Sequence, residues 1–453
     1  MLIWLGVKNF GKIEDARICI NKFTVLVGSN NSGKTFLMQL AHGINDEIAN
    51  LVDVSDVKEF IAEEVNGYEK YIIDTHNIDK LENIMNKKLY ERKENIVRDI
   101  FKKNIEIDEL TLEIELDKDE VYEIEYFGKN ADTELINEKL NDAPQNIIKY
   151  IEEGNSISVL KIYQQQQRIK SVANIGISTQ NNILYNPLKA IFTKKSLFMP
   201  ASRTGLMMLY KEYFANKADD AMNFYIDKNG HLIQEITYGD ITRPTYEFLR
   251  FLQMYNDENK SEYYSDELKF FDRNIIEGHI LVNKQGRFAY KQDNYDDNIP
   301  MYLASSMINE VAPIALALNS RAYNQFIIDE VEASLHPEKQ QELVRLLVRL
   351  SNKDMSLIVS THSDTFVSKI NNLYVLSNKE NANKYLEQLG FDKKDLMNTD
   401  NIYVYSFESN KNGKCSVKEI KPDKDYGYQF DLFMNSNLKL YKETSILEDG
   451  GNK

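Results

Sequence analysis

The chain has 453 residues, of which 42% are hydrophobic, and it carries a formal net charge of −15 at pH 7. This length accommodates two or three average domains, or one domain with large insertions. The acidic charge argues against a general basic coat for nucleic acid, although a local basic groove stays open. No apolar run approaches the length of a membrane span, and two cysteines, Cys19 and Cys415, are too few for a disulfide framework or a zinc site. We therefore expect a cytoplasmic protein without membrane contact.

Two strands, 2–8 and 16–20, are predicted on either side of a turn at Asn9-Phe10-Gly11. An apolar strand at 23–27 then leads into Gly28-Ser-Asn-Asn-Ser-Gly-Lys-Thr35, and an apolar helix begins at Phe36. This is a complete phosphate-binding loop of the pattern G-x-x-x-x-G-K-[ST], with the strand and the helix that such a loop requires. Its backbone N–H groups are expected to surround the β- and γ-phosphates of a nucleoside triphosphate.

The residues of this loop have separate expected roles in binding ATP and Mg²⁺. Gly28 and Gly33 permit the tight path and the close approach of the phosphates. Lys34 reaches the phosphate oxygens, and Thr35 supplies a hydroxyl ligand to Mg²⁺. The other nucleotide-binding residues predicted in the loop are Asn30, Asn31 and Ser32.

Residues 51–189 are predicted to form an insertion of helices and a β-hairpin. Apolar residues recur at helical spacing over 51–105. The basic residues of this segment are interleaved with acids, which leaves either a solvated helix face or a nucleic-acid patch. Apolar and polar residues alternate over 110–116 and 121–126, which predicts a half-exposed hairpin across 117–120.

Arg203 follows a predicted core strand at 196–200, a place where α/β folds often put ligand contacts. It either faces a phosphate or a partner subunit, or it is paired with an acid inside the fold. Residues 206–279 are then expected to form a helical insertion, whose many aromatic side chains form a core rather than base-stacking platforms. A hairpin around Lys284-Gln-Gly286 returns the chain to sheet.

Three further motifs follow. Ser305 and Ser306 stand at the start of a predicted helix, where they either bind an anion or cap the helix. An apolar strand at 325–328 ends in Asp329 and Glu330, the Walker B arrangement, in which the first carboxylate holds the Mg²⁺ shell and the second polarises the attacking water. A third strand at 356–360 leads to His362, which we interpret as a γ-phosphate sensor rather than a structural histidine.

These motifs occur in the order of an ABC-type ATPase head, and the long stretch between Lys34 and Asp329 must contain inserted lobes. Lys8-Asn-Phe10, the phosphate loop, Asp329-Glu-Val-Glu-Ala-Ser-Leu-His-Pro337 and Ser360-Thr-His-Ser363 together resemble the SMC/RecF/OLD-like branch of ABC ATPases. Within that branch the chain looks most like the stand-alone ATPases of anti-phage systems, such as AriA of PARIS and PtuA of Septu.

The resemblance implies an α/β fold: an ABC-type P-loop ATPase head with a mixed sheet, flanking helices and an antiparallel β lobe. Residues 1–50, 190–205 and 280–453 would form this head. It also implies a head-to-tail dimer or higher homo-oligomer, in which each ATP lies between the phosphate loop of one subunit and the signature helix of the other.

The resemblance assigns residues as well. Asp329 and Thr35 would form the Mg²⁺ site, Glu330 would be the catalytic base and His362 the switch histidine. Ser305 and Ser306 would be signature residues that contact the partner's ATP.

This sequence departs from the family pattern at two positions. Val331 replaces a proline that usually follows the two carboxylates. Met307 stands where a glycine usually follows the serines, so we expect slow hydrolysis with ATP acting as a clamp.

Two functions are compatible with these motifs. The first is a nucleotide-gated sensor or scaffold in anti-phage defence, triggered by DNA or a phage protein and controlling a separately encoded nuclease or toxin. The alternative is a DNA-repair or chromosome-handling ATPase of the RecF/SMC kind. The chain after His362 is too short for the Toprim nuclease domain of OLD-type proteins, and the acidic charge and lack of sustained heptads favour the first function.

Overall fold

The computed structural model describes residues 1–52, 56, 58–65, 67–128, 131, 139, 156–164, 167–175, 185–222, 225–226, 232–233, 241–257, 260–283 and 286–449. Its contacts divide the chain into two compact units. Unit 1 consists of Met1–Asn21 and Gln39–Ser196, and unit 2 consists of Lys22–Met38 and Leu197–Lys453. The division into a head and two insertions stays a prediction.

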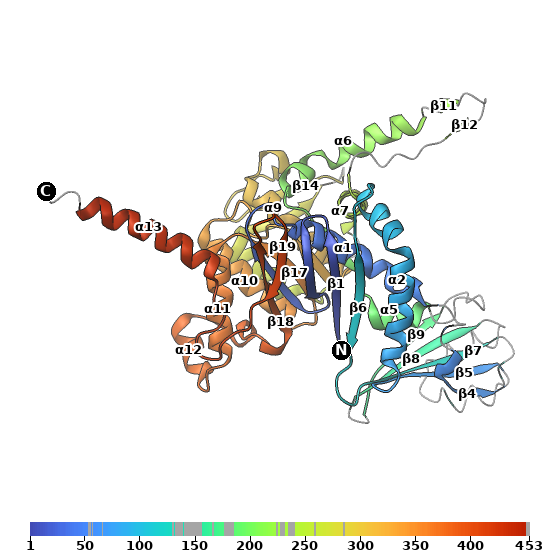
Figure 1. Ribbon diagram of the computed structural model, residues 1–453. Coiled ribbons are helices and arrows are strands. Elements are labelled where there is room, and N and C mark those ends of the chain that lie inside the picture. The colour runs from blue at the N-terminus through green and yellow to red at the C-terminus, as the bar shows by residue number, and fades with distance from the viewer. Residues whose placement is uncertain are drawn as a thin grey trace. The chain divides into compact units, whose positions relative to one another are not determined.

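Unit 2 is built on a largely parallel sheet (Figure 1). The strand order is β10-β16-β17-β3-β18-β19. Strands β3 (Phe23–Gly28), β16 (Gln325–Ile328) and β17 (Ser356–Thr361) pair in parallel and are buried along their whole length. Continuous burial explains their unbroken apolar runs, because both faces of a parallel sheet are covered by helices. β10 (Ser196–Met199) confirms the core strand predicted before Arg203.

The last part of unit 2 contributes a core strand that the sequence analysis missed. β18 (Ile402–Ser409) pairs in parallel with β3, and β19 (Cys415–Glu419) pairs antiparallel with β18. Between β17 and β18 lie α11 (Asp364–Ser377), α12 (Ala382–Leu389) and the short turns η7 (Lys393–Asp395) and η8 (Thr399–Asn401). Figure 1 shows α13 (Asp431–Asp449), in red, as the last helix before the C-terminus.

The helical expectation for the segment after Arg203 is confirmed. The helices are α6 (Arg203–Met222), α7 (Arg243–Met254) and α8 (Ser265–Phe271), which continues into a π turn at Asp272–Ile276. The two-residue strands β11 (Tyr225–Ile226) and β12 (Leu232–Ile233) lie between α6 and α7. The aromatic residues form core as predicted, and the buried ones include Tyr210, Phe248, Phe251, Phe270 and Phe271.

The hairpin predicted next is also present. β13 (Gly278–Val282) and β14 (Phe288–Gln292) pair antiparallel, and β15 (Ile299–Pro300) adds to β14. Lys284 and Gln285 of the predicted turn lie outside the described residues. The turn η6 (Met301–Leu303) then leads into α9 (Ser306–Ser320).

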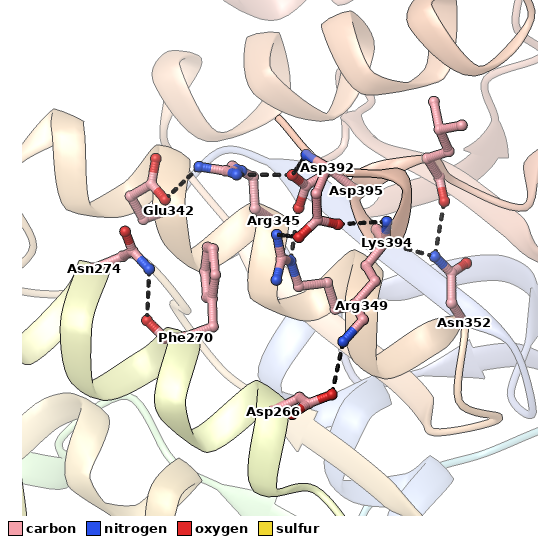
Figure 2. A network of polar contacts seen from close by, with 11 residues as sticks. Asp266, Phe270, Asn274, Glu342, Arg345, Arg349, Asn352, Asp392, Lys394 and Asp395 are labelled. Carbon is pink, nitrogen blue, oxygen red and sulfur yellow. Dashed lines mark hydrogen bonds and ion pairs between the residues drawn. The ribbon is translucent and has the colours of Figure 1, made fainter. Parts of the chain in front are cut away.

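Helix α10 (Pro337–Ser351) is tied to the rest of unit 2 by a buried charge network, shown in Figure 2. Arg345 and Arg349 donate to the two carboxylate oxygens of Asp395, both at 2.7 Å, and Asp395 is fully buried. Phe270 of α8 lies under both guanidinium groups. Buried charges persist only when they are paired and hydrogen-bonded, so this network fixes η7 against α10.

Unit 1 contains two sheets and a long helix. β1 (Leu2–Phe10) pairs antiparallel with β2 (Ile13–Cys19) and β6 (Glu109–Glu115). The second sheet has the order β4-β5-β7-β8-β9. Its strands are β4 (Ile61–Val65), β5 (Tyr68–Ile73), β7 (Val121–Phe127), β8 (Ile157–Gln164) and β9 (Gln167–Ile175). The remaining elements are α1 (Lys34–Glu47), which begins in unit 2, η1 (Ile48–Leu51), η3 (Lys58–Phe60), α2 (Ile78–Phe101) and α5 (Tyr185–Phe192).

Two expectations for unit 1 are wrong. The segment 51–105 is not helical throughout, because β4 and β5 form a hairpin within it. Tyr71 and Ile73 of β5 are buried two residues apart, which is the period of a strand. The strands 110–116 and 121–126 do not pair with each other either. β6 pairs with β1, whereas β7 pairs with β5 and β8, so partners distant in sequence replace the local hairpin.

Three basic residues in α2 or directly after it contact nearby acids. Lys88 pairs with Asp56, Arg92 with Glu47 at 3.2 Å, and Lys102 with Asp99 at 3.0 Å. These pairs favour the solvated helix face over the nucleic-acid patch. Among the helices that the structure describes, none has the length and apolar character needed to cross a bilayer. Both cysteines are buried, and they do not form a disulfide with each other.

Candidate nucleotide-binding site

The phosphate loop joins the end of β3 to the start of α1, as predicted. Gly28 is the last residue of β3, where an added Cβ would lie 2.7 Å from the Cβ of Phe407 on the neighbouring strand β18. A side chain at position 28 would therefore separate the two strands. Asn31 and Gly33 have positive φ angles of 60° and 101°, which turn the loop back to the helix. Asn30 and Asn31 are exposed, and Ser32 is buried.

Lys34 is held over the loop by its own residues. Its Nζ donates to the carbonyl oxygens of Gly28 at 3.0 Å and Ser29 at 2.9 Å, and to Ser32 Oγ at 3.3 Å. Burial lowers the pKa of Lys34 to about 8, although the carboxylate of Asp329 acts in the opposite direction. The ammonium group is thus poorly solvated, and an anion beside it would relieve that cost.

Thr35 and Asp329 lie together. Thr35 Oγ1 donates to Asp329 Oδ2 at 2.6 Å, and Ser360 Oγ donates to the other oxygen, Oδ1, at 2.5 Å. Asp329 follows β16, Ser360 lies near the end of β17 and Thr35 follows β3, so three neighbouring parallel strands bring these oxygens to one edge of the sheet. A hydroxyl and a carboxylate at this distance are the donor set that Mg²⁺ prefers, with phosphate oxygens and water as its other ligands.

Glu330 has an uncommon backbone conformation and an exposed side chain. Its φ angle is +46°, in the left-handed region that residues other than glycine rarely occupy. Its N–H donates to Ser360 Oγ at 2.8 Å, and its carbonyl accepts from Arg203 at 3.1 Å and from the N–H of Ala333 at 3.0 Å. The exposed side chain of Glu330 thus belongs to the turn that follows β16, directly after Asp329.

Glu332 is a further residue of the site. It lies within the motif 329–337, but the motif did not predict a role for it. Its Oε1 accepts a hydrogen bond from the backbone N–H of His362 at 2.6 Å, and its Oε2 is buried with no hydrogen-bond partner among the described residues. Burial lowers the pKa of the His362 imidazole, as does the nearby Lys34 ammonium, while Glu332 acts in the opposite direction. The carboxylate thus positions the histidine loop and partly balances its charges.

Arg203 is placed differently from the nucleotide contact predicted for it. It is 1% exposed and forms an ion pair between its Nε and Glu310 Oε2 at 3.0 Å. Its guanidinium also donates to the carbonyl of Asp329 at 2.6 Å. The structure therefore favours the alternative of an arginine paired with an acid: Arg203 supports the Walker B turn from behind and does not present its charge to a ligand.

Ser305 and Ser306 stand at the N-terminus of α9, as predicted. Ser305 is the N-cap residue, and its Oγ accepts from the N–H of Ile308 at 3.4 Å. The capping alternative is therefore realised for Ser305. Both serines are exposed, so the cap does not prevent either hydroxyl from contacting another molecule. Within the described residues, no group of three or more His, Cys, Asp or Glu side chains forms a metal cluster.

A parallel sheet with a phosphate loop after β3, adjacent carboxylates after β16 and a histidine after β17 defines an ABC-type P-loop ATPase head. The predicted α/β fold class is confirmed. The family model for the AAA ATPase domain matches residues 1–367, and the chain belongs to this family of ATPases.

Solved structures that match the chain include heads of SMC proteins. The SmcHead bound to the C-winged helix domain of ScpA is 13% identical, with a TM-score of 0.36 over 92% of this chain and 98% of that one. The SMC head domain from Thermotoga maritima is 11% identical, with a TM-score of 0.33 over 93% of this chain and 99% of that one. Among curated proteins, none matches the chain.

Proposed function

We propose that this ATPase hydrolyses ATP slowly with Mg²⁺, and that two copies close head to tail around the nucleotide. The observation that carries the proposal is the contact of Thr35 with Asp329 at 2.6 Å beside a complete phosphate loop. ATP would lie on the loop and Lys34, and Thr35 and Asp329 would hold Mg²⁺, which supplies charge neutralisation for the phosphates.

The residues of this chain then have defined tasks. Lys34 balances phosphate charge, and Glu330 accepts the proton of the attacking water because its carboxylate is exposed at the edge of the sheet. His362 is kept largely neutral near pH 7 by burial, so its imidazole can donate to or accept from a γ-phosphate oxygen according to its tautomer. The exposed serines at the start of α9 serve the ATP of the partner subunit.

At the level of the cell, we propose a nucleotide-gated sensor or scaffold in anti-phage defence that controls a separate effector. The motifs shared with the defence ATPases support this role, as does the net charge of −15. The pairing of Lys88, Arg92 and Lys102 with acids also supports it, because these three cations are less available to DNA phosphates.

The purified protein and Lys34→Ala test the enzymatic part. The parent should bind ATP and release phosphate slowly, only with Mg²⁺, and Lys34→Ala should lose nucleotide binding because no cation remains to balance the γ-phosphate. Equal ATP affinity in the two proteins would contradict the assignment of Gly28–Thr35 as the phosphate-binding loop.

DNA separates the two cellular roles. If the defence role is correct, DNA should not change the rate of ATP turnover. This chain alone should then cleave neither plasmid nor RNA. A strong stimulation of ATPase activity by duplex DNA would favour the repair or chromosome-handling role. Plasmid nicking that survives Lys34→Ala and co-purifies with the protein would contradict a separate effector.

A further inference from the structure

Arg203 joins two parts of unit 2 that serve different nucleotides in the proposed dimer. One part is the Walker B turn at Asp329 and Glu330, which belongs to the subunit's own ATP site. The other is helix α9, whose N-terminal Ser306 would meet the ATP of the partner. The guanidinium donates to the carbonyls of Asp329 at 2.6 Å and Glu330 at 3.1 Å, and its Nε lies 3.0 Å from Glu310 Oε2 and 2.9 Å from the Glu310 carbonyl on α9.

Glu310 uses its other oxygen to extend this link. Its Oε1 accepts from the backbone N–H of Thr204 at 3.0 Å and from Thr204 Oγ1 at 2.7 Å. Thr204 Oγ1 also lies 3.3 Å from the carbonyl of Ser306, one helical turn before Glu310. The contacts therefore run from the Walker B turn, through Arg203 and Glu310, to the first turn of α9.

The chemistry of this link makes it stiff. Arg203 and Glu310 are 1% and 4% exposed, and an arginine presents a planar fork of donors in fixed geometry. Breaking such a pair in a dry interior leaves an uncompensated charge, so the two groups move together rather than apart. The same guanidinium helps to hold the left-handed conformation of Glu330, since one of the two hydrogen bonds to the Glu330 carbonyl comes from Arg203.

We propose that Arg203, Glu310 and Thr204 couple occupancy of a subunit's own ATP site to the position of the serine-led start of α9. Any shift of the Walker B turn on nucleotide binding is transmitted by the Arg203 fork to Glu310 and thus to Ser306. Arg203 is a positioning residue. Through this link, ATP on a subunit's own phosphate loop places the start of its α9 for contact with the ATP of the partner. This inference rests on the proposed function, since it takes the phosphate loop as an ATP site.

Hydrogen exchange measured by mass spectrometry tests the link within a single subunit. The protein is kept dilute enough to be monomeric by light scattering, and Mg-ATP is added. In the parent, peptides from the phosphate loop and from the start of α9 should both exchange at least about threefold more slowly with ATP. Arg203→Lys keeps the charge but loses the planar fork of donors. In this variant ATP should still slow hydrogen exchange in the phosphate loop, but it should no longer slow exchange at the start of α9.

Two milder variants keep the test decisive if Arg203→Lys does not fold. Thr204→Val removes only the hydroxyl contacts to Glu310 and Ser306, and Glu310→Gln keeps the shape but removes the charge. Both should weaken the response of α9 while leaving ATP affinity within about threefold of the parent. The matched control is Arg345→Lys, another buried arginine in an ion pair of the same unit, which should lower the melting temperature and keep the response of α9.

The outcomes are distinct. An α9 response that is unchanged in all three link variants, or is missing in the parent despite a protected loop, overturns the coupling. A loss of response in Arg345→Lys equal to that in Arg203→Lys would reduce the link to general stability and also overturn it. If ATP does not slow hydrogen exchange in the phosphate loop of the parent, this result would instead contradict the proposed function itself.

Discussion

Thr35 and Asp329 are 294 positions apart in the sequence, yet Thr35 Oγ1 lies 2.6 Å from Asp329 Oδ2. Ser360 Oγ holds the second carboxylate oxygen at 2.5 Å, so the carboxylate has one fixed orientation. The parallel register of β16, β17 and β3 creates this arrangement, because the ends of these strands meet at one edge of the sheet. The groups that we propose as metal ligands are thus already positioned by the fold itself.

Removing the threonine hydroxyl should weaken the response to Mg²⁺. Thr35→Val keeps the shape of the side chain, and we expect the half-saturating Mg²⁺ concentration for ATP hydrolysis to rise by about 10-fold or more. ATP binding measured in EDTA should stay unchanged, because Lys34 and the loop remain. A Mg²⁺ titration of turnover decides this, with the exposed Thr444→Val as control. An unchanged titration curve for Thr35→Val would show that Thr35 is not a metal ligand.

ATP binding at alkaline pH should take up a proton. Lys34 has a pKa of about 8 because of its burial, and the negative charge of bound ATP must raise that pKa. Between the free and bound pKa values, ATP affinity should fall by up to about tenfold for each unit of rising pH.

Calorimetry at pH 9 in buffers of different ionisation enthalpy measures this proton uptake directly. We expect about one proton taken up per ATP, falling towards zero at pH 6.5, where Lys34 is already charged. Lys34→Arg provides the control, since arginine does not titrate in this range. Proton uptake of the same size in Lys34→Arg would assign it to another group.

Glu330→Gln should trap an ATP-bound assembly. The amide keeps the shape of the carboxylate but cannot accept a proton from water, so ATP would bind without being consumed. Since the nucleotide is proposed to be shared by two subunits, it should hold them together by mass action. Light scattering should show an ATP-dependent dimer or larger species for Glu330→Gln and none for the control Glu338→Gln, which alters an exposed residue of α10.

Adding Ser306→Glu to Glu330→Gln should prevent this association. The new carboxylate would meet the partner's γ-phosphate at the N-terminus of α9, and like charges repel at close range. ATP binding to the subunit's own loop should persist. A mass for Glu330→Gln that does not depend on ATP, or a double variant that associates normally, would argue against a shared site while leaving ATP binding intact.

Glu332 should affect His362 and the rate of ATP turnover through both its hydrogen bond and its charge. Glu332→Gln can still accept from the His362 N–H but loses the negative charge, so the pKa of His362 should fall further below its ordinary value. Glu332→Ala loses the hydrogen bond as well and should reduce turnover more than Glu332→Gln does. Histidine NMR titrations and steady-state rates on both variants measure the two effects. Equal titration of His362 in the parent and Glu332→Gln would exclude the charge effect.

Asp395→Asn should destabilise unit 2 without changing the nucleotide site. Burial alone would raise the pKa of Asp395, but hydrogen bonds from Arg349 and Arg345 outweigh it and the pKa lies below its ordinary value. Removing the charge leaves two buried guanidinium groups underpaired, and we expect a loss of about 3 kcal/mol at pH 7.

Thermal melting from pH 7 to pH 3 tests this expectation and its sign. A carboxyl with a depressed pKa stabilises the fold above its unfolded pKa and stops doing so as the pH falls through its folded pKa. The difference between the parent and Asp395→Asn should therefore shrink below about pH 4. Asp266→Asn, which breaks only an exposed pair with Lys394 on the edge of the network in Figure 2, should lower the melting temperature much less than Asp395→Asn does.

The sequence determined the parts of this protein whose chemistry is local. Gly28–Thr35 between an apolar strand and a helix identified the phosphate loop, because its residue types and spacing are set by the loop's own backbone. Asp329 and Glu330 were found in the same way, as carboxylates directly after a buried strand. The buried aromatic residues of the α6–α8 segment followed from helical periodicity.

The tertiary structure alone decided which distant segments meet. Periodicity describes one strand at a time, so it paired 110–116 with its neighbour 121–126, whereas the fold pairs β6 with β1 and β7 with β5. Arg203 looked equally suited to a phosphate and to an acid, and only the position of Glu310 on α9 placed it behind the Walker B turn. Glu332 gave no signal of its own, because its role depends on the N–H of His362, which β17 brings beside it. These contacts depend on long-range packing, which the identity of the residues nearby in sequence does not encode.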